Sequence, residues 1–434
     1  MAKNKLRRPT IAFFDYPDVF EDFYPHYGVN QKDFATSWHN TGSHAWLRII
    51  QEKVGMIKWM AFTLKPELNE DRHQYIGGEV IMLKSSFLHR LLWKAFYLPS
   101  FAWRWQAHYR AYAGISSYLL PWSFQFFRKL ISLKPDAILV QDYCSGKYDI
   151  CWLLSRVLRI PLLAYHTGST PEGYLGKSIR KFTLPRADWV FPSADSEMAM
   201  LNQRYRISRS KMSIIRPPID TDIYRSMDRE EACRRTGLDP NRRYFIYIGR
   251  LNERFKRLGS IIKAFGKITK EYDEIDLLVL GKGQDESDLK YLAKEEAGDR
   301  IHFLGWVAGD QDKCHYLNAS EVLIMASARE GVPGVIGEAF SCGIPVISSS
   351  VGGIGELVLP GKSGWIFEAG DDQSLYLAMK EQAQNPHTAR KMSAFVREIA
   401  EDKFSIQAVG KALTKGFEEV LSHKNLFPNY LRRK

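Results

Sequence analysis

The sequence predicts an α/β protein with two domains, each built on a doubly wound parallel sheet. A length of 434 residues suits two hydrophobic cores, and 45% hydrophobic with 25% charged residues is ordinary for a globular chain. Short apolar runs typical of buried strands alternate with helical runs in both halves of the chain. Glycine turns follow several of the apolar runs, as expected where strands end.

Charge and cysteine usage narrow the compartment and the partners. The net charge of +12 and the pI of about 9.3 favour acidic partners such as nucleotide phosphates, anionic lipid or nucleic acid. The cysteines are odd in number and scattered, with neither metal-ligand spacing nor a disulfide framework, which favours a reducing compartment. They are Cys144, Cys151, Cys233, Cys314 and Cys342. With no signal-peptide core and no clean apolar span, we expect a cytoplasmic protein, peripheral attachment to the cytoplasmic face of a membrane remaining open.

The first half of the chain opens with the pattern of a nucleotide-binding α/β domain. Residues 9–15 read as the first strand, and residues 56–64 and 77–83 as further strands. The tetrapeptide T-G-S-H at 41–44 precedes the helical run 45–52. This tetrapeptide is either a glycine turn that faces a ligand or a plain helix N-cap.

The interval 84–134 has an unusual composition. No acidic residue occurs from Val80 to Pro135, while lysines, arginines and aromatic residues alternate throughout. Bases and aromatics at helical spacing suit a helix that lies on an anionic membrane surface. Packing of the aromatics into the domain core is the plainer alternative, and nucleic acid is the least favoured partner because nothing else resembles a nucleic-acid module.

A histidine stands at the end of a later predicted strand. Residues 134–143 read as a strand entered from a helix, residues 148–158 as a helix, and residues 160–169 as a buried strand that carries His166 at its carboxyl end. Ligands of parallel α/β sheets bind at the carboxyl ends of the strands. His166 is therefore a candidate site residue, the alternative being a structural histidine.

The predicted domain limits are 1–215 for the first domain and 244–403 for the second, with 216–243 as linker and 404–434 as a terminal helix and tail. The linker contains the pair Asp220 and Asp222, a D-x-D, which in some enzymes holds a divalent metal beside a diphosphate. Because it follows a double proline in a connecting stretch, we interpret it as structural and expect no metal site.

The second half repeats the alternation of strands and helices. Residues 243–251, 277–283 and 301–307 each read as a strand that ends in a glycine turn. Helical runs follow at 371–386 and 387–402, and the tail 404–421 is amphipathic.

The stretch from Ser327 to Gly364 carries the most specific chemistry. A strand, 322–326, enters a loop rich in glycine and proline that opens a helix near Gly334 or Val335, with Glu330 before the loop and Glu338 one turn into the helix. Helix N-termini attract anions, and two carboxylates can accept hydrogen bonds from two sets of hydroxyls. This combination suits a nucleotide sugar. The alternative is that Glu330 is a loop acid and Glu338 a solvated acid of the first turn.

Four blocks in order resemble glycosyltransferase family 4, retaining enzymes of GT-B fold. They are E-G-V-P-G-V-I-G-E with its continuation (330–358), Y-I-G-R-L-N-E-R-F-K-R-L (247–258), L-L-V-L-G-K-G (277–283) and I-H-F-L-G-W-V (301–307). The resemblance covers about residues 135–405. It implies two Rossmann-like domains with an interdomain cleft and a C-terminal helix that crosses back to the first domain.

The resemblance assigns Arg250 and Lys256 to the departing diphosphate, where fixed cations stabilise charge without a metal or other cofactor. Arg254 and Arg257 are rival cations. This sequence departs from the family at Arg257, where glycine is frequent, so the entry to the following helix is expected to differ.

The remaining assignments concern the donor. Glu338 would take the ribose hydroxyls and Glu330 the hexose hydroxyls, the amides of Gly334 and Val335 the phosphates, and Val307 or Trp306 the base. In the first domain the resemblance places His166 near the transferred sugar and Gly42 in the loop that faces the donor phosphate.

These assignments predict retaining transfer of a hexosyl unit from a UDP- or GDP-hexose to a glycan or lipid-linked acceptor, in polysaccharide or glycolipid synthesis. Two alternatives remain: a nucleotide-sugar epimerase or hydrolase on the same fold, and a non-catalytic GT-B binding module.

Overall fold

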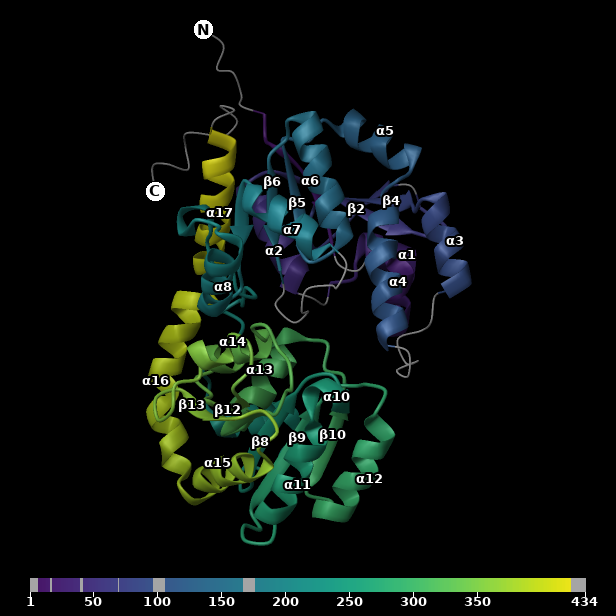
Figure 1. Ribbon diagram of the computed structural model, residues 1–434. Helices are drawn as coiled ribbons and strands as arrows, with labels where there is room; N and C mark the ends of the chain where they lie inside the picture. Colours follow the sequence, from purple (N-terminus) through teal and green to yellow (C-terminus); the bar gives the residue numbers. More distant parts are fainter. Residues whose placement is uncertain are drawn as a thin grey trace. The chain divides into compact units, whose positions relative to one another are not determined.

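The structure is a computed structural model that describes residues 7–422, apart from 16–17, 40–41, 69, 97–105 and 167–175. The chain divides into two compact units (Figure 1). Unit 1 comprises Met1–Ser193, Glu197–Ile215 and Gly410–Lys434, and unit 2 comprises Ala194–Ser196 and Arg216–Val409.

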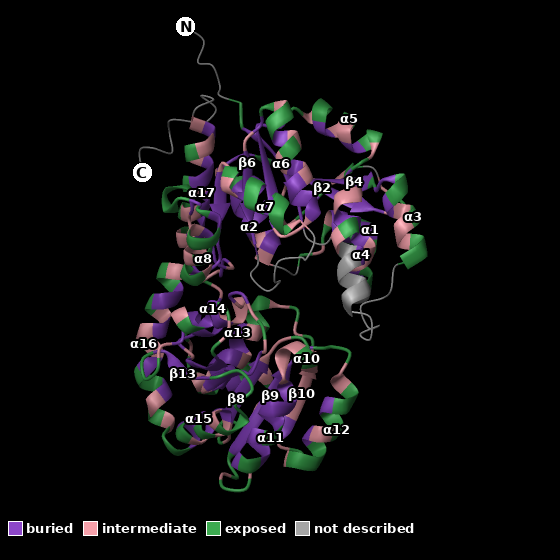
Figure 2. Cartoon of the chain, in the orientation of Figure 1, coloured by how far each residue is buried: buried purple, intermediate pink, exposed green. Residues whose placement is uncertain are grey.

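Unit 1 contains a seven-stranded sheet in the order β3-β4-β2-β1-β5-β6-β7. All neighbouring strands are parallel except β3 and β4. The strands are β1 (Thr10–Phe14), β2 (Met56–Thr63), β3 (Glu70–Arg72), β4 (Glu79–Lys84), β5 (Ala137–Gln141), β6 (Leu162–Tyr165) and β7 (Trp189–Phe191). Central strands β1 and β5 are buried along their whole length, as expected for a parallel sheet covered on both faces (Figure 2).

The helices of unit 1 alternate with these strands or follow them. They are α1 (Gln31–Thr36), α2 (Gly42–Lys53), α3 (Phe87–Phe96), α4 (Gln106–Leu119), α5 (Phe124–Leu133), α6 (Gly146–Leu158), α7 (Lys177–Thr183), most of α8 (Asp195–Tyr205) and most of α17 (Ile406–Leu421). Helix α17 packs on β7, since the rings of Phe417 and Phe191 lie 6.2 Å apart and Ser213 donates a hydrogen bond to the carbonyl of Ala412.

Unit 2 contains a six-stranded parallel sheet in the order β10-β9-β8-β11-β12-β13. The strands are β8 (Arg243–Ile248), β9 (Ile275–Leu280), β10 (Ile301–Gly305), β11 (Val322–Met325), β12 (Val346–Ser349) and β13 (Gly364–Phe367). The helices are α9 (Arg229–Thr236), α10 (Glu253–Lys256), α11 (Leu258–Ile268), α12 (Glu286–Ala297), α13 (Asp310–Ala319), α14 (Gly334–Ser341), α15 (Asp372–Gln384) and α16 (Pro386–Lys403).

Both sheets are doubly wound, so each has a point where the strand order reverses. The reversal lies between β1 and β5 in unit 1 and between β8 and β11 in unit 2. Ligands of open α/β sheets bind outside the carboxyl ends of the strands at such a point. The fold therefore directs attention to the segments after β1, β5, β8 and β11.

The sequence-based prediction of fold class and of the return of the terminal helix is confirmed. Most predicted strands occur within a few residues of their expected ends. Strand β3, which is polar, and strand β13, which begins at Gly364, were not predicted. The segment 216–243, predicted as a linker, belongs to unit 2 and contains α9, whose Ala232 and Cys233 are fully buried.

The interval 84–134 forms α3, α4 and α5 in its described part. Some of its apolar side chains are core residues: Leu120, Phe126 and Leu130 are buried. Others remain exposed, notably Phe87 at 70% and Phe124 at 81%. The core-packing interpretation thus holds for part of the interval, and contact of the exposed part with a membrane surface stays a prediction. Among the described helices, none is long and apolar enough to cross a membrane.

The turns after β8 and β9 are pressed against each other. A Cβ on Gly281, whose φ is +149°, would lie 1.9 Å from the carbonyl oxygen of Gly249. A Cβ on Gly283 would lie 2.1 Å from the carbonyl oxygen of Leu251. Only glycine permits this approach of two backbones, which fixes the turn that carries Arg250.

Gly281→Ala should therefore lower the stability of unit 2 by about 2–4 kcal/mol, because backbone strain and a steric overlap add. Gly237→Ala is the matched control: its φ is +71° but its Cβ would meet nothing within 4 Å, so it should cost only about 1 kcal/mol. Urea unfolding of both variants measures the difference. Equal losses would contradict a steric role for Gly281.

Candidate functional site

The segment after β8 carries the first predicted cation. Arg250 is exposed in the turn, and the hydroxyl of Tyr247 donates a 2.8 Å hydrogen bond to its carbonyl oxygen. Burial, together with the negative charge of Glu330, raises the pKa of Tyr247, so its hydroxyl keeps the proton that makes this bond. Asn252 then caps the short helix α10 by accepting from the amide of Phe255.

Arg257 takes the backbone conformation that glycine prefers. Its φ is +51°, and it ends α10 and begins α11 at once. The expected difference from the family at the entry to α11 stays a prediction. The side chain of Arg257 reaches the carboxylate of Asp372 at 3.5 Å.

Lys256 and Glu330 form an ion pair. The Lys256 ammonium donates to Oε1 of Glu330, and Ser327 donates to the same oxygen at 2.8 Å. Both charged side chains are mostly buried, with 19% and 12% of the lysine and glutamate exposed. The sequence assigned Lys256 to a diphosphate and Glu330 to a sugar, and gave no sign that they touch each other.

The glycine pair after β12 holds the backbone of Glu330 in place. A Cβ on Gly352 would lie 2.1 Å from the carbonyl oxygen of Glu330, and the amide of Gly353 donates to the carbonyl of Gly331 at 2.9 Å. Pro333 is the N-cap of α14, which begins at Gly334 as predicted. The amides of Gly334 and Val335 lie in the first turn, where helices leave N–H groups without intrahelical partners.

Glu338 lies one turn into α14 and also meets a lysine. Lys313 of α13 contacts Glu338 Oε1 at 3.1 Å and Asp310 at 3.0 Å, and its ammonium lies 5.4 Å from the ring of Tyr224. Burial lowers the pKa of Lys313, but the carboxylates of Glu338 and Asp310 outweigh it, so the pKa lies above its ordinary value. Sequence reasoning missed Lys313, because a lysine in a polar helix belongs to no motif.

These contacts give unit 2 two carboxylates that are each paired with a lysine and separated by a glycine loop. Both lie beyond the carboxyl ends of the strands at the β8/β11 reversal. Each carboxylate keeps lone pairs for hydroxyl donors, and the helix start between them can face an anion.

Val307 and Trp306 lie in the segment between β10 and α13. They line a cavity of about 330 Å³ together with Arg235, Asp312 and His315. Lys313 leaves α13 on another face from Asp312 and His315, and neither glutamate lines the cavity. The predicted contact of Val307 with a base stays a prediction.

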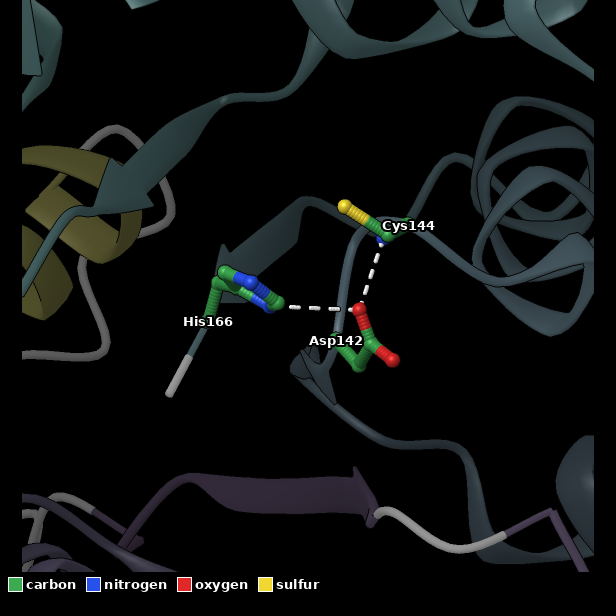
Figure 3. Close-up of side chains that lie close together, drawn as sticks. All are labelled: Asp142, Cys144 and His166. Carbon is green, nitrogen blue, oxygen red and sulfur yellow. Dashed lines mark hydrogen bonds and ion pairs between the residues drawn. The ribbon is translucent and has the colours of Figure 1, made fainter. Parts of the chain in front are cut away.

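His166 and Gly42 belong to unit 1. His166 follows β6 and lies 3.2 Å from Asp142 (Figure 3). Its ring packs against that of Tyr143. Burial lowers the pKa of His166, but the hydrogen bond and charge of Asp142 outweigh burial and raise it. Gly42 begins α2, and the next residue, Ser43, donates to Gln141 at the end of β5, so both predicted residues lie near the same sheet edge.

The acids of the D-x-D belong to a turn, and a second group of acids, in unit 1, surrounds a buried lysine. Asp220 accepts from the amides of Asp222 and Ile223, so the D-x-D acts as a turn cap. In unit 1, Lys147 contacts Asp18 at 3.3 Å and donates to the carbonyl of Asp15. Burial raises the pKa of Asp15 to about 6, against the lowering effect of Lys147. The sequence gave no signal for this buried lysine.

Two family models match the chain. The model for glycosyl transferases group 1 matches residues 228–399, and that for glycosyltransferase family 4 matches residues 86–223. Together they span both units of the fold.

Curated relatives agree with these matches. N-acetyl-alpha-D-glucosaminyl L-malate synthase of Bacillus anthracis is 30% identical over 56% of this chain and 61% of that protein. A D-inositol 3-phosphate glycosyltransferase of Thermobifida fusca is 24% identical over 58% of this chain and 65% of that protein. The matches thus span less than two thirds of the length of these relatives.

Solved structures share the fold across nearly the whole chain. Sucrose-phosphate synthase of Thermosynechococcus elongatus has a TM-score of 0.70 at 18% identity, covering 96% of this chain and all of that one. HepE of Anabaena in complex with UDP has a TM-score of 0.68 at 15% identity, covering 94% and 98%.

The strain at Arg257 yields a stability prediction. Arg257→Gly should leave unit 2 as stable as the parent or up to about 1 kcal/mol more stable, because glycine relieves the left-handed strain and the half-exposed pair with Asp372 contributes little. Arg257→Ala removes the same ion pair and keeps the strain, so it is the matched control and should be less stable than the glycine variant in urea unfolding. A glycine variant no more stable than the alanine variant would show that Arg257 is not strained.

Proposed function

We propose a function from the premise that this chain belongs to glycosyltransferase family 4 and has the GT-B fold. The protein transfers a hexosyl unit from a nucleotide sugar to an acceptor hydroxyl with retention of configuration. The observation that carries this proposal is the pair of lysine-held carboxylates, Glu330 and Glu338, on either side of the start of α14.

The donor would lie along the glycine loop of unit 2. Glu338 would accept from the ribose hydroxyls, Glu330 from the hexose hydroxyls, and the amides of Gly334 and Val335 would donate to the diphosphate. Val307 would flank the base. The donor is a UDP- or GDP-hexose, and the solved relatives bound to UDP and UDP-glucose favour UDP as the first to test.

Charge stabilisation would drive departure of the nucleotide. As the glycosidic bond to the diphosphate breaks, negative charge grows on the leaving oxygen, where a fixed cation acts most strongly. Arg250 can bridge two phosphate oxygens and Lys256 can supply a point charge. These two cations would do the work of a divalent metal, so we propose a reaction without a metal cofactor.

Glu330 would orient the sugar rather than attack it. Its carboxylate already accepts from Lys256 and Ser327, which lowers its nucleophilicity and fixes its direction. The acceptor hydroxyl would approach on the face that the nucleotide leaves, and the departing diphosphate would take its proton. His166 and Gly42 would contribute from unit 1, near the transferred sugar and the phosphate.

The acceptor we propose is a glycan or lipid-linked saccharide reached at a cytoplasmic membrane face. Helix α3 supports this because Phe87, Leu88 and Leu91 are exposed on a helix of a segment without acids. Exposed apolar residues flanked by lysine and arginine fit an anionic lipid surface.

Glu330→Gln tests the proposed function. The amide keeps the shape but weakens the acceptor and its pairing with Lys256, so transfer should fall at least about 100-fold while UDP-sugar affinity changes less than about tenfold. Mass spectrometry of products measures transfer, and thermal shift with UDP- and GDP-sugars measures binding. Lys256→Ala should show the same split.

Glu286→Gln is the matched control, since this acid lies on α12 in an i,i+4 pair with Lys290. It should keep parental transfer. Parental transfer by Glu330→Gln would remove Glu330 from the mechanism. Conversion of the donor at full rate without any acceptor would indicate a hydrolase or epimerase instead.

The membrane proposal predicts sedimentation with liposomes that contain anionic lipid. Phe87→Ser with Leu91→Ser should lower the bound fraction several-fold, because each exposed apolar group adds about 1.5–3 kcal/mol when buried. The double change Tyr291→Ser with Leu377→Ser removes exposed apolar groups of similar size from unit 2 and should leave sedimentation unchanged. Sedimentation that neither depends on anionic lipid nor falls with added salt would exclude this surface.

A further inference from the structure

Asp142, Cys144 and His166 form a compact group at the carboxyl ends of β5 and β6 in unit 1 (Figure 3). We propose that these three side chains bind Zn²⁺, and that the bound ion inhibits the transfer reaction. The proposal concerns an inhibitory site rather than a cofactor, and its inhibitory part rests on the proposed function.

The geometry brings three ligand atoms together. One oxygen of Asp142, one ring nitrogen of His166 and the sulfur of Cys144 all lie within 4.8 Å of one another. The oxygen and the nitrogen are already 3.2 Å apart. Cys144 is only half-buried and lies on a turn, so of the three ligands it is the one whose surroundings restrict it least. Coordination would require its sulfur to move inward.

The backbone holds the two inner ligands. Asp142 has a φ of +67°, and its carboxylate accepts from the amide of Cys144 at 3.0 Å, which ties the aspartate to the cysteine turn. The His166 ring packs against Tyr143, with ring centroids 5.0 Å apart. The hydroxyl of Tyr143 is itself held by Glu197. A preorganised set of ligands loses less freedom when the ion binds.

The donor set is the one that zinc selects. Zn²⁺ binds sulfur, imidazole nitrogen and carboxylate oxygen, and three protein ligands leave its fourth position open to water. A carboxylate and a thiolate neutralise the two charges of the ion. On binding, the thiol proton and the proton on the coordinating nitrogen of a protonated His166 pass to solvent. Calcium and magnesium prefer oxygen ligands, so a mixed sulfur, nitrogen and oxygen site discriminates against them.

No comparable group occurs elsewhere in the described part of the chain. Cys314 and Cys342 have sulfurs 3.8 Å apart in unit 2, but no histidine or acid joins them within this range. His302 meets Asp276, whose carboxylate is already engaged by Arg242 and Arg300. The site after β5 and β6 is therefore the one where all three donor types coincide.

Occupancy would remove His166 from the reaction. The imidazole that we assign to the neighbourhood of the transferred sugar would be bound to the ion, which would also place a positive charge there. Zinc should therefore lower turnover without any contact with the lysine-held carboxylates of unit 2.

Cobalt absorption on the purified full-length protein tests binding without a substrate. Co²⁺ should give a thiolate charge-transfer band in the parent, and Zn²⁺ should displace it. Cys144→Ser should abolish the band and weaken Zn²⁺ affinity at least about tenfold. Cys233→Ser, the same change at a buried cysteine of unit 2, should keep both.

Alkylation of the parent by iodoacetamide provides a measurement that needs no variant. Zn²⁺ should protect Cys144 in the mass spectrum of the digested protein. An equal cobalt band in the parent and Cys144→Ser, or alkylation of Cys144 unaffected by Zn²⁺, would overturn the site. In the absence of zinc, Cys144→Ser should turn over at the parental rate, and zinc should no longer inhibit this variant. If the parent binds the metal but its turnover is insensitive to zinc, the site stands and only the inhibition is overturned.

Discussion

The ion pair between Lys256 and Glu330 is the interaction on which the rest of the site depends. Two mostly buried charges are stable only when geometry and added hydrogen bonds offset the loss of water. The fold provides that geometry through the adjacency of β8 and β11, the serine that donates to Glu330, and the glycine at 352 that admits its backbone. All three of these features act on the carboxylate or the backbone of Glu330.

The second carboxylate, Glu338, is also paired with a lysine, which comes from a different helix. Glu338 is held by Lys313, and Lys313 by Asp310 and the face of Tyr224. In both cases the charge of the acid is balanced before a ligand arrives. A neutral polyol can then bind without burying an unpaired charge, because it needs only to supply hydroxyl donors to the remaining lone pairs. The loop between Glu330 and Glu338 contains no further acid, so no negative charge in the loop opposes an anion at the start of α14.

The sequence analysis predicted strands and turns, which local patterns encode. It missed contacts between residues that only the fold brings together. Apolar runs marked the buried strands, and the glycine blocks marked the turns after β8 and β9. The polar strand β3 has no such run, and Lys313 reaches Glu338 from a separate helix, so neither left a signal. Likewise Cys144 and His166 end different strands, and their approach follows from the parallel pairing of β5 with β6. The odd arginine at 257 was visible in the sequence, whereas its left-handed backbone was not.

The division of the chain bears on how the proposed chemistry is built. Arg250, Lys256, Glu330 and Glu338 all belong to unit 2, so the proposed recognition of the donor would depend on one sheet and the loops at its strand reversal. The corresponding reversal of unit 1 bears a different set of groups, an acid with an imidazole at one strand end and a buried lysine among acids at another. Because none of these four residues of unit 2 is among the proposed zinc ligands, a metal bound in unit 1 would leave the proposed nucleotide contacts of unit 2 intact. The proposed zinc site would therefore lower turnover without a change in nucleotide affinity, whereas a loss of nucleotide affinity would point to the residues of unit 2.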